Sequence, residues 1–78
     1  MANIKVYSTP TCPYCKMAKN YFTENNIPFE EIDVSANQFS AQEMISKSGQ
    51  LGVPVIDIDG EVIVGFNRPK IAKILGLA

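Results

Sequence analysis

Apolar and polar positions follow two different periods along the chain, and the change of period separates strands from helices. Residues 4–8, IKVYS, are rich in β-branched and aromatic side chains, which favours a strand. From Pro13 to Phe22 apolar side chains recur every three or four residues, which is typical of one face of a helix. This helix should end near Asn25, and residues 27–34, IPFEEIDV, favour a second strand. We expect these elements to form a βαβ unit with parallel strands.

The segment FSAQEMISKSG carries the start and stop signals of a second helix. Ser40 and Glu43 have the spacing of a capping box. Phe39 and Met44 are spaced like the hydrophobic staple that often accompanies such a box. Gly49 is a typical residue at which a helix ends. We therefore predict a helix that begins at Ser40 and ends before Gly49.

A hairpin and a third helix complete the predicted order. Residues 53–58 and 61–64 favour strands, and the Asp59-Gly60 dipeptide between them is one that a type I′ hairpin turn prefers. Asn67 can cap a last helix. The order βαβαββα predicts an α/β fold, in which a four-stranded mixed sheet packs against three helices.

Length and charge limit the kind of protein this can be. A chain of 78 residues is predicted to form a single domain over residues 1–78, and the 46% of apolar residues must supply its core. Seven basic and eight acidic residues give a net charge of −1, which provides no basic surface for nucleic acid or membranes. The start, MANIKVYS, lacks the apolar run of a secretory signal. We expect a cytoplasmic monomer that binds neither nucleic acid nor membrane.

Both cysteines of the chain lie in one short stretch, TPTCPYCK, and the chain has no histidine. In the cytoplasm such a pair is more often catalytic or metal-binding than structural. Cys12 falls where the first strand passes into the first helix. The N–H groups of Tyr14 and Cys15 could therefore stabilise its thiolate without a histidine base. We predict that Cys12 attacks a substrate disulfide and that Cys15, less exposed and more protonated, resolves the mixed disulfide.

Other uses of the cysteine pair fit the sequence less well. A cysteine hydrolase needs a Cys–His pair, and a structural zinc site usually needs four cysteine or histidine ligands. An iron–sulfur cluster shared by two chains would have its four sulfur ligands, so a non-catalytic metal-binding module stays an alternative. A disulfide that closes so short a loop restrains the unfolded chain little. We expect a catalytic pair and no metal.

Pro54 stands at the start of a predicted strand, where proline lacks the N–H group that a sheet ladder uses. A trans bond at a sheet edge is the ordinary explanation, because only about 5% of X–Pro bonds are cis. A cis bond facing the thiols would instead turn the backbone of Val53 outward, where an extended peptide could pair with it. The sequence leaves both alternatives open.

Three motifs together resemble the glutaredoxins over nearly the whole chain: CPYC after IKVYSTPT, then GVPVI, then VGF before the last helix. The resemblance implies the thioredoxin-like fold in its smallest form. It also implies glutathione-dependent reduction of disulfides and of glutathionylated proteins, with Cys12 as nucleophile and Cys15 as resolving thiol. The residues that it implies for glutathione binding are Tyr14, Val53, Pro54, Gly65, Phe66 and Asn67.

The chain also departs from the glutaredoxin pattern. Gly52 stands where glutaredoxins commonly have threonine, and VGFNRP replaces a Gly-Gly-x-Asp-Asp run, so no acid meets the amine of glutathione. Gln50 or Arg68 could offer polar or cationic contacts instead. Gly-Phe followed by Arg-Pro is similar to the small redoxins that serve ribonucleotide reductase and are reduced by thioredoxin reductase. A flavoprotein reductase is therefore the alternative partner to glutathione.

Overall fold

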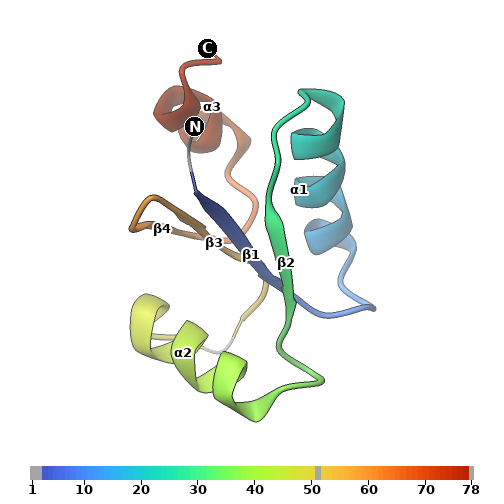
Figure 1. The fold of residues 1–78 in the computed structure, drawn as a ribbon, viewed down its shortest axis with the longest axis vertical. Helices are drawn as coiled ribbons and strands as arrows, with labels where there is room; N and C mark the ends of the chain where they lie inside the picture. Colours follow the sequence, from blue (N-terminus) through green and yellow to red (C-terminus); the bar gives the residue numbers. More distant parts are fainter. Residues whose placement is uncertain (1–2, 51, 78) are drawn as a thin grey trace.

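The computed structural model describes residues 3–50 and 52–77, and within them the elements follow the predicted order βαβαββα. The elements are β1 (Ile4–Ser8), α1 (Pro13–Glu24), β2 (Glu30–Asp33), α2 (Gln38–Ser48), β3 (Val55–Ile58), β4 (Glu61–Val64) and α3 (Arg68–Leu75). The sheet has the strand order β2-β1-β3-β4 (Figure 1). The β1–β2 pair is parallel and the other two pairs are antiparallel, so the predicted mixed sheet is confirmed.

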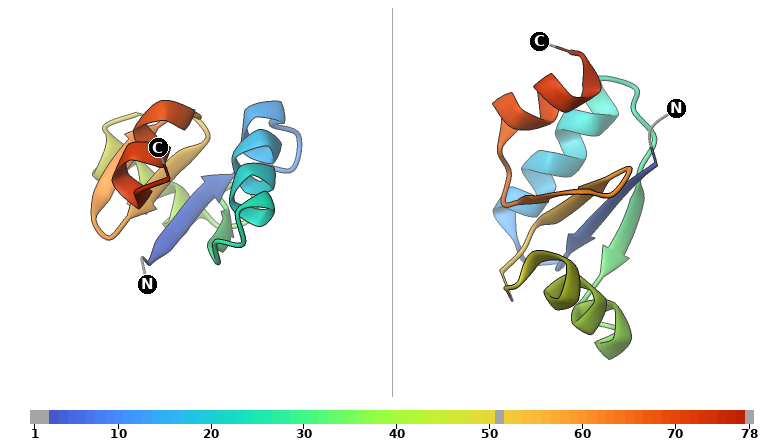
Figure 2. Two further views of the ribbon diagram at one scale, coloured as in Figure 1. Left: turned by 90° about the horizontal axis from the view of Figure 1, so that it is seen from above. Right: turned by 90° about the vertical axis from the view of Figure 1, so that its left-hand side faces the viewer.

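The sheet separates two helical layers of unequal size. Helices α1 and α3 lie on one face and α2 lies on the other (Figure 2). Side chains alternate between the faces, so β1 directs Val6 toward α1 and α3 and directs Tyr7 toward α2. The larger core comprises Ile4, Val6, Ala18, Tyr21, Phe22, Ile56, Ile58, Ile63 and Ile71. The smaller core comprises Tyr7, Met44 and Val55.

Residues with positive φ lie at the ends of helices and make the hairpin turn. Asp59 and Gly60 have φ angles of 51° and 93°, as a type I′ turn requires. Gly49 has φ 76° at the end of α2, and Asn26 has φ 56° just after α1. These local signals placed the hairpin and both helix ends correctly.

Two predicted strands begin later than the sequence suggested. The second strand was predicted over residues 27–34, but β2 starts at Glu30. Pro28 has no N–H group for the ladder, and the Ile27 amide donates to the Phe22 carbonyl at 2.8 Å to close the turn after α1. The third strand was predicted from Val53 and starts at Val55, after the backbone turns at Pro54.

The predicted start of α2 is wrong. The helix begins at Gln38, because the side-chain oxygen of Asn37 accepts hydrogen bonds from the N–H groups of Phe39 at 2.9 Å and Ser40 at 3.2 Å. Ser40 is therefore inside the helix and forms no capping box. The staple is also absent, since Phe39 is 81% exposed while Met44 is buried.

Candidate active site at the start of the first helix

Cys12 occupies the N-cap position of α1, where the chain leaves β1. Its backbone is extended, with φ −87° and ψ 114°, and Pro13 follows as the first helical residue. The Cys12 carbonyl accepts a hydrogen bond from the Lys16 N–H at 3.3 Å, and the Cys12 N–H donates to the Thr9 carbonyl at 3.4 Å. The start of the helix therefore fixes the backbone of Cys12 as the sequence predicted.

The Cys12 sulfur lies against the free end of the helix. The Cys15 N–H donates to Cys12 Sγ at 3.2 Å, which satisfies one of the N–H groups that lack a partner within the helix. Cys12 Sγ also lies 3.8 Å from the carbonyl oxygen of Val53, to which the thiol can donate. A sulfur that attacks a disulfide therefore sits where a helix-terminal N–H can hydrogen-bond to it, at the positive end of the helix.

Cys15 lies one helical turn further on, in a different environment. Its side chain is fully buried, whereas Cys12 is partly exposed, as predicted. Burial, reinforced by the hydrogen bond with Cys12, raises the pKa of the Cys15 thiol to about 11, although the nearby charge of Lys19 acts in the opposite direction. Cys15 is therefore the protonated member of the pair at neutral pH.

The Val53–Pro54 peptide bond is cis, which decides between the two alternatives that the sequence left open. The Pro54 carbonyl accepts a hydrogen bond from the Gly65 N–H at 2.8 Å. Gly65 has φ 79°, a conformation that glycine adopts readily. The segment before β3 and the connection from β4 to α3 are thus joined beside the Cys12 thiol.

A pocket of about 230 Å³ opens next to this junction. It brings together five of the six residues predicted to bind glutathione: Tyr14, Val53, Pro54, Gly65 and Phe66. Tyr14 is 61% exposed at the edge of this pocket. Asn67 lies outside this pocket, and its side-chain oxygen accepts the Lys70 N–H at 3.3 Å to cap α3.

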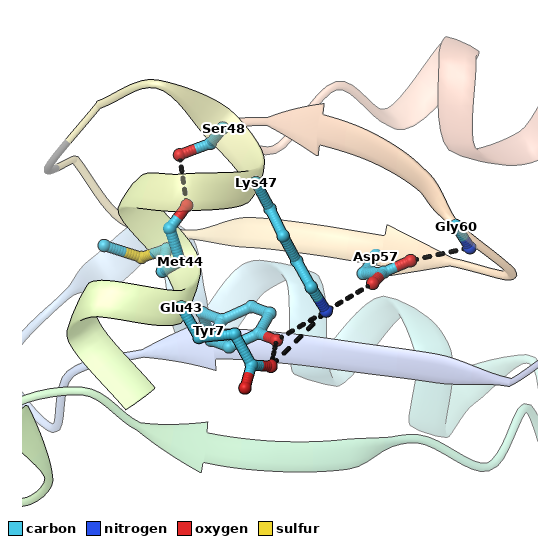
Figure 3. A network of polar contacts seen from close by, with 7 residues as sticks. All are labelled: Tyr7, Glu43, Met44, Lys47, Ser48, Asp57 and Gly60. Atoms are coloured by element: carbon cyan, nitrogen blue, oxygen red, sulfur yellow. Dashed lines mark hydrogen bonds and ion pairs between the residues drawn. The ribbon is translucent and has the colours of Figure 1, made fainter. Parts of the chain in front are cut away.

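A polar cluster on the other face of the sheet was missed by the sequence analysis. Lys47 Nζ lies 2.8 Å from Asp57 Oδ2, 3.0 Å from the Tyr7 hydroxyl and 3.4 Å from Glu43 Oε1 (Figure 3). The Tyr7 hydroxyl donates to Glu43. We call these four residues the Lys47 cluster. An acid within an apolar strand and a Glu–Lys pair four residues apart were the signals in the sequence.

The Lys47 cluster ties α2 to the sheet through charge. Burial alone would raise the pKa of Asp57, but hydrogen bonds from Lys47 and from the Gly60 amide hold that pKa below its usual value. Hydrogen bonds to Asp57 and Tyr7 raise the pKa of Lys47. Tyr7 also belongs to the smaller core, against which Val53 packs, so the cluster supports the segment that faces the Cys12 sulfur.

Residues 3–50 and 52–77 contain neither a helix that could span a membrane nor a cluster of metal ligands. None of the helices described there combines the length and the apolar character needed to cross a bilayer. No three side chains of the His, Cys, Asp or Glu type converge there as a set of metal ligands.

Comparisons with known proteins place the fold in one class. Over its full length the chain superposes on a mutant of the thioredoxin-like protein BC3987, with a TM-score of 0.91, 32% identity and complete coverage of both chains. A thioredoxin-like fold with a cysteine pair at the start of its first helix defines a class of thiol redox proteins. The Glutaredoxin family model matches residues 4–63, and the chain belongs to the glutaredoxin family.

Relatives within the family differ in their names. A glutaredoxin-like 8.6 kDa protein in a rubredoxin operon of Clostridium pasteurianum is 51% identical, covering 92% of this chain and 96% of its own. Glutaredoxin 3 of Escherichia coli K12 is 40% identical, covering 83% of this chain and 78% of its own. The glutaredoxin-like protein NrdH of Lactococcus lactis IL1403 is 34% identical, covering 91% of this chain and 97% of its own.

Proposed function

We propose that this chain is a cytoplasmic, monomeric thiol–disulfide oxidoreductase that takes its electrons from glutathione. The observation that carries the proposal is the pairing of an N-capping Cys12, whose sulfur accepts a helix-terminal N–H, with a buried Cys15 of raised pKa. One thiol is partly exposed and lies against a helix-terminal N–H, and the other keeps its proton until it is needed. This division suits attack by Cys12 and resolution by Cys15.

The reaction proceeds by two exchanges of disulfide bonds. The Cys12 thiolate attacks one sulfur of the substrate disulfide, so that the substrate S–S bond breaks, a Cys12–substrate disulfide forms and one substrate thiolate leaves. Cys15 then attacks Cys12 Sγ and gives up its proton to the second thiolate as that group leaves. The protein dithiol is oxidised by two electrons, and the substrate becomes two thiols. Two glutathione molecules reduce the Cys12–Cys15 disulfide and become glutathione disulfide.

The pocket beside Cys12 supports binding of a short peptide such as glutathione. Its apolar lining includes Tyr14, Pro54 and Phe66, and Val53, which also lines it, has its carbonyl oxygen 3.8 Å from the Cys12 sulfur. The backbone of Val53 borders the same space and can pair with an extended peptide, as strand addition does. We assign the glutathione moiety of a mixed disulfide to this pocket, with its γ-glutamyl carboxylate toward Gly65 and Asn67 at the start of α3.

A thioredoxin reductase is the alternative source of electrons. The similarity to NrdH of Lactococcus lactis and the Gly65–Phe66 and Arg68–Pro69 pairs support it. An assay of NADPH consumption with a small disulfide separates the two. One cuvette contains glutathione and glutathione reductase, and the other contains thioredoxin reductase. We expect consumption in the first. Turnover in the second cuvette alone would assign the chain to the alternative.

The roles of the two thiols are tested with Cys15→Ser. Removal of a glutathionyl group needs only the Cys12 thiol, so this variant should keep deglutathionylation. It should lose most reduction of protein disulfides, because the mixed disulfide is no longer resolved internally. The matched variant Cys12→Ser should lose both activities. Full reduction of protein disulfides by Cys15→Ser would contradict the assigned roles.

A further inference from the structure

A second hollow adjoins the pocket of about 230 Å³ beside Cys12, and Phe66 lines both. The second hollow has a volume of about 220 Å³ and lies between α1 and the start of α3. Its lining residues are Met17, Asn20, Tyr21, Glu24, Phe66 and Arg68. The Phe66 ring packs edge-on against Tyr21, with 6.0 Å between ring centroids, and forms the floor common to both hollows. A polypeptide attached to Cys12 can therefore continue from the first hollow into the second.

The side chains along this path change from apolar to charged with distance from the thiol. Tyr14 and Met17 are one helical turn apart and are 61% and 49% exposed, which leaves an apolar surface near the sulfur. The guanidinium of Arg68 lies 5.3 Å from the centre of the Tyr21 ring. Tyr21 is two turns of α1 beyond Tyr14, a rise of about 10 Å. About three residues of extended chain cover that distance.

Arg68 carries a positive charge that is held in place but not neutralised. The contact with the Tyr21 ring orients its guanidinium. Within residues 3–50 and 52–77, no carboxylate lies within 4.0 Å of it, whereas Lys19 and Lys47 both have carboxylate partners there. Glu24 lines the same hollow but forms no ion pair with Arg68 among the described residues. The oriented guanidinium at the edge of an apolar path is therefore complementary to a carboxylate brought by a substrate.

We propose that this second hollow receives the polypeptide segment next to the substrate's disulfide, and that Arg68 selects segments with an acidic side chain about three residues from the cysteine. This inference rests on the proposed function and names its substrate class, acidic protein segments. Apolar residues of the segment would lie over Met17 and Phe66, and the carboxylate would lie at Arg68.

The test uses two peptides that differ at one position. Each carries one cysteine, as a mixed disulfide with the same small thiol, and either glutamate or lysine three residues away. Single-turnover reduction by the reduced protein is followed by quenching and mass spectrometry, so the protein dithiol is the only reductant and neither glutathione nor a reductase is present. We expect the glutamate peptide to react about fivefold faster at low salt, with the difference shrinking at high salt. A neutral small disulfide serves as the internal reference.

Variants at Arg68 separate this inference from a general charge effect. Arg68→Glu should reverse the preference between the peptides, and Arg68→Lys should keep most of it. Lys70→Gln is the matched control, because Lys70 is exposed on the same helix but lines a different hollow. Equal rates for the two peptides, an unchanged preference in Arg68→Glu, or an equal loss in Lys70→Gln would overturn the inference while the proposed function stands. Failure to reduce any disulfide would overturn the proposed function itself.

Discussion

Cys12 and Cys15 are one helical turn apart, yet the fold gives their thiols opposite properties. Cys12 is partly exposed at the end of the helix, where an amide N–H points at its sulfur. Cys15 is inside the first turn and is fully buried. Desolvation disfavours a charged sulfur, so burial raises the pKa of Cys15 and keeps it protonated, whereas Cys12 Sγ accepts a helix-terminal N–H. The spacing of the cysteines thus gives one thiol an exposed position and the other a buried one, as the proposed order of attack by Cys12 and resolution by Cys15 requires.

The raised pKa of Cys15 predicts its reactivity toward an alkylating reagent. In Cys12→Ser, the Cys15 thiol should react with iodoacetamide much more slowly at pH 8 than a cysteine in the unfolded chain, because it keeps its proton until about pH 11. Its rate should rise with pH toward that value. The measurement is the rate of mass increase between pH 7 and 11, with Cys15→Ser as the control that leaves the accessible thiol.

The raised pKa of Cys15 also predicts how the stability of the folded chain changes with pH. The pKa of Cys15 is about 11 in the folded chain, compared with 9.0 for an ordinary cysteine. The folded state therefore binds this proton more tightly, and its contribution is complete below about pH 9. That contribution is lost as the pH rises through 11. A Cys15 thiol in Cys12→Ser that alkylates at pH 8 as fast as in urea would contradict both conclusions.

At the scale of the elements, α2 shows how a nearby alternative can mislead sequence interpretation. Both Asn37 and Ser40 are residues that can cap a helix, and Ser40 has an acid three residues later. In the structure Asn37 accepts hydrogen bonds from the N–H groups of Phe39 and Ser40. Glu43 instead forms an ion pair with Lys47 on the side of α2 that faces the sheet. A tertiary contact therefore decides the use of Glu43.

The two candidate caps of α2 predict different costs when they are removed. Asn37→Ala should lower the free energy of unfolding by about 1 kcal/mol, because the N–H groups of Phe39 and Ser40 lose their acceptor. Ser40→Ala should change it by less than about 0.5 kcal/mol, since alanine is favourable inside a helix. Urea denaturation of both variants measures the difference. A larger loss of unfolding free energy in Ser40→Ala than in Asn37→Ala would show that Ser40 caps the helix, as in the predicted capping box.

The elements that could be predicted are those whose signal is local. The Asp59-Gly60 turn, the Gly49 helix end and the Asn67 cap each depend on a few neighbouring residues, and all three were placed correctly. The βαβ pattern likewise gave the strand pairing of β1 and β2. The Lys47 cluster could not be assembled from its local signals alone, because the contacts of Tyr7 with Glu43 and Lys47 join residues that are 36 and 40 positions apart in the chain.

The candidate site could be predicted only in part, because some of its contacts join residues that are far apart in the chain. The position of Cys12 at a strand–helix junction follows from adjacent residues, and so does the burial of Cys15. The cis bond before Pro54 and its contact with Gly65 depend on packing between distant segments. Sequence alone therefore indicated the thiols by their own chemistry, and it indicated the pocket beside them through the resemblance to the glutaredoxins.

At the scale of the whole molecule, the two faces of the sheet are stabilised in different ways. The face under α1 and α3 carries the larger apolar core, whereas Met44 is the buried residue that α2 contributes. Lys47 adds a polar contact to this small apolar one, because its ammonium group donates hydrogen bonds to Asp57 and to the Tyr7 hydroxyl. Regions with few apolar contacts open at lower free energy than the core. Helix α2 should therefore be the first helix to exchange its amide hydrogens.

Lys47→Met tests how far α2 depends on charge, because it keeps an apolar chain of similar length and removes the ammonium group. The variant leaves the mostly buried Asp57 unpaired, and we expect a loss of about 2 kcal/mol, between the values for exposed and buried ion pairs. Amide exchange should accelerate in α2 more than in β1 and β3. Lys70→Met, which removes an exposed charge from α3, should leave α2 unchanged.

The pH dependence of the stability of Lys47→Met provides a second, independent test. Hydrogen bonds from Tyr7 and Lys47 hold the pKa of Glu43 below its usual value of 4.5, and the pKa of Asp57 is lowered from 3.8. Their contribution is therefore complete above about pH 4.5 and is lost as the carboxylates take up protons at lower pH. Wild type should lose more stability than Lys47→Met between pH 5 and pH 3, because the variant has already lost the pairing. Two outcomes would show that the apolar contact of Met44 holds α2 without the Lys47 cluster. One is that wild type and Lys47→Met lose the same free energy of unfolding between pH 5 and pH 3, as measured by urea denaturation. The other is that amide exchange in Lys47→Met is uniform across all helices.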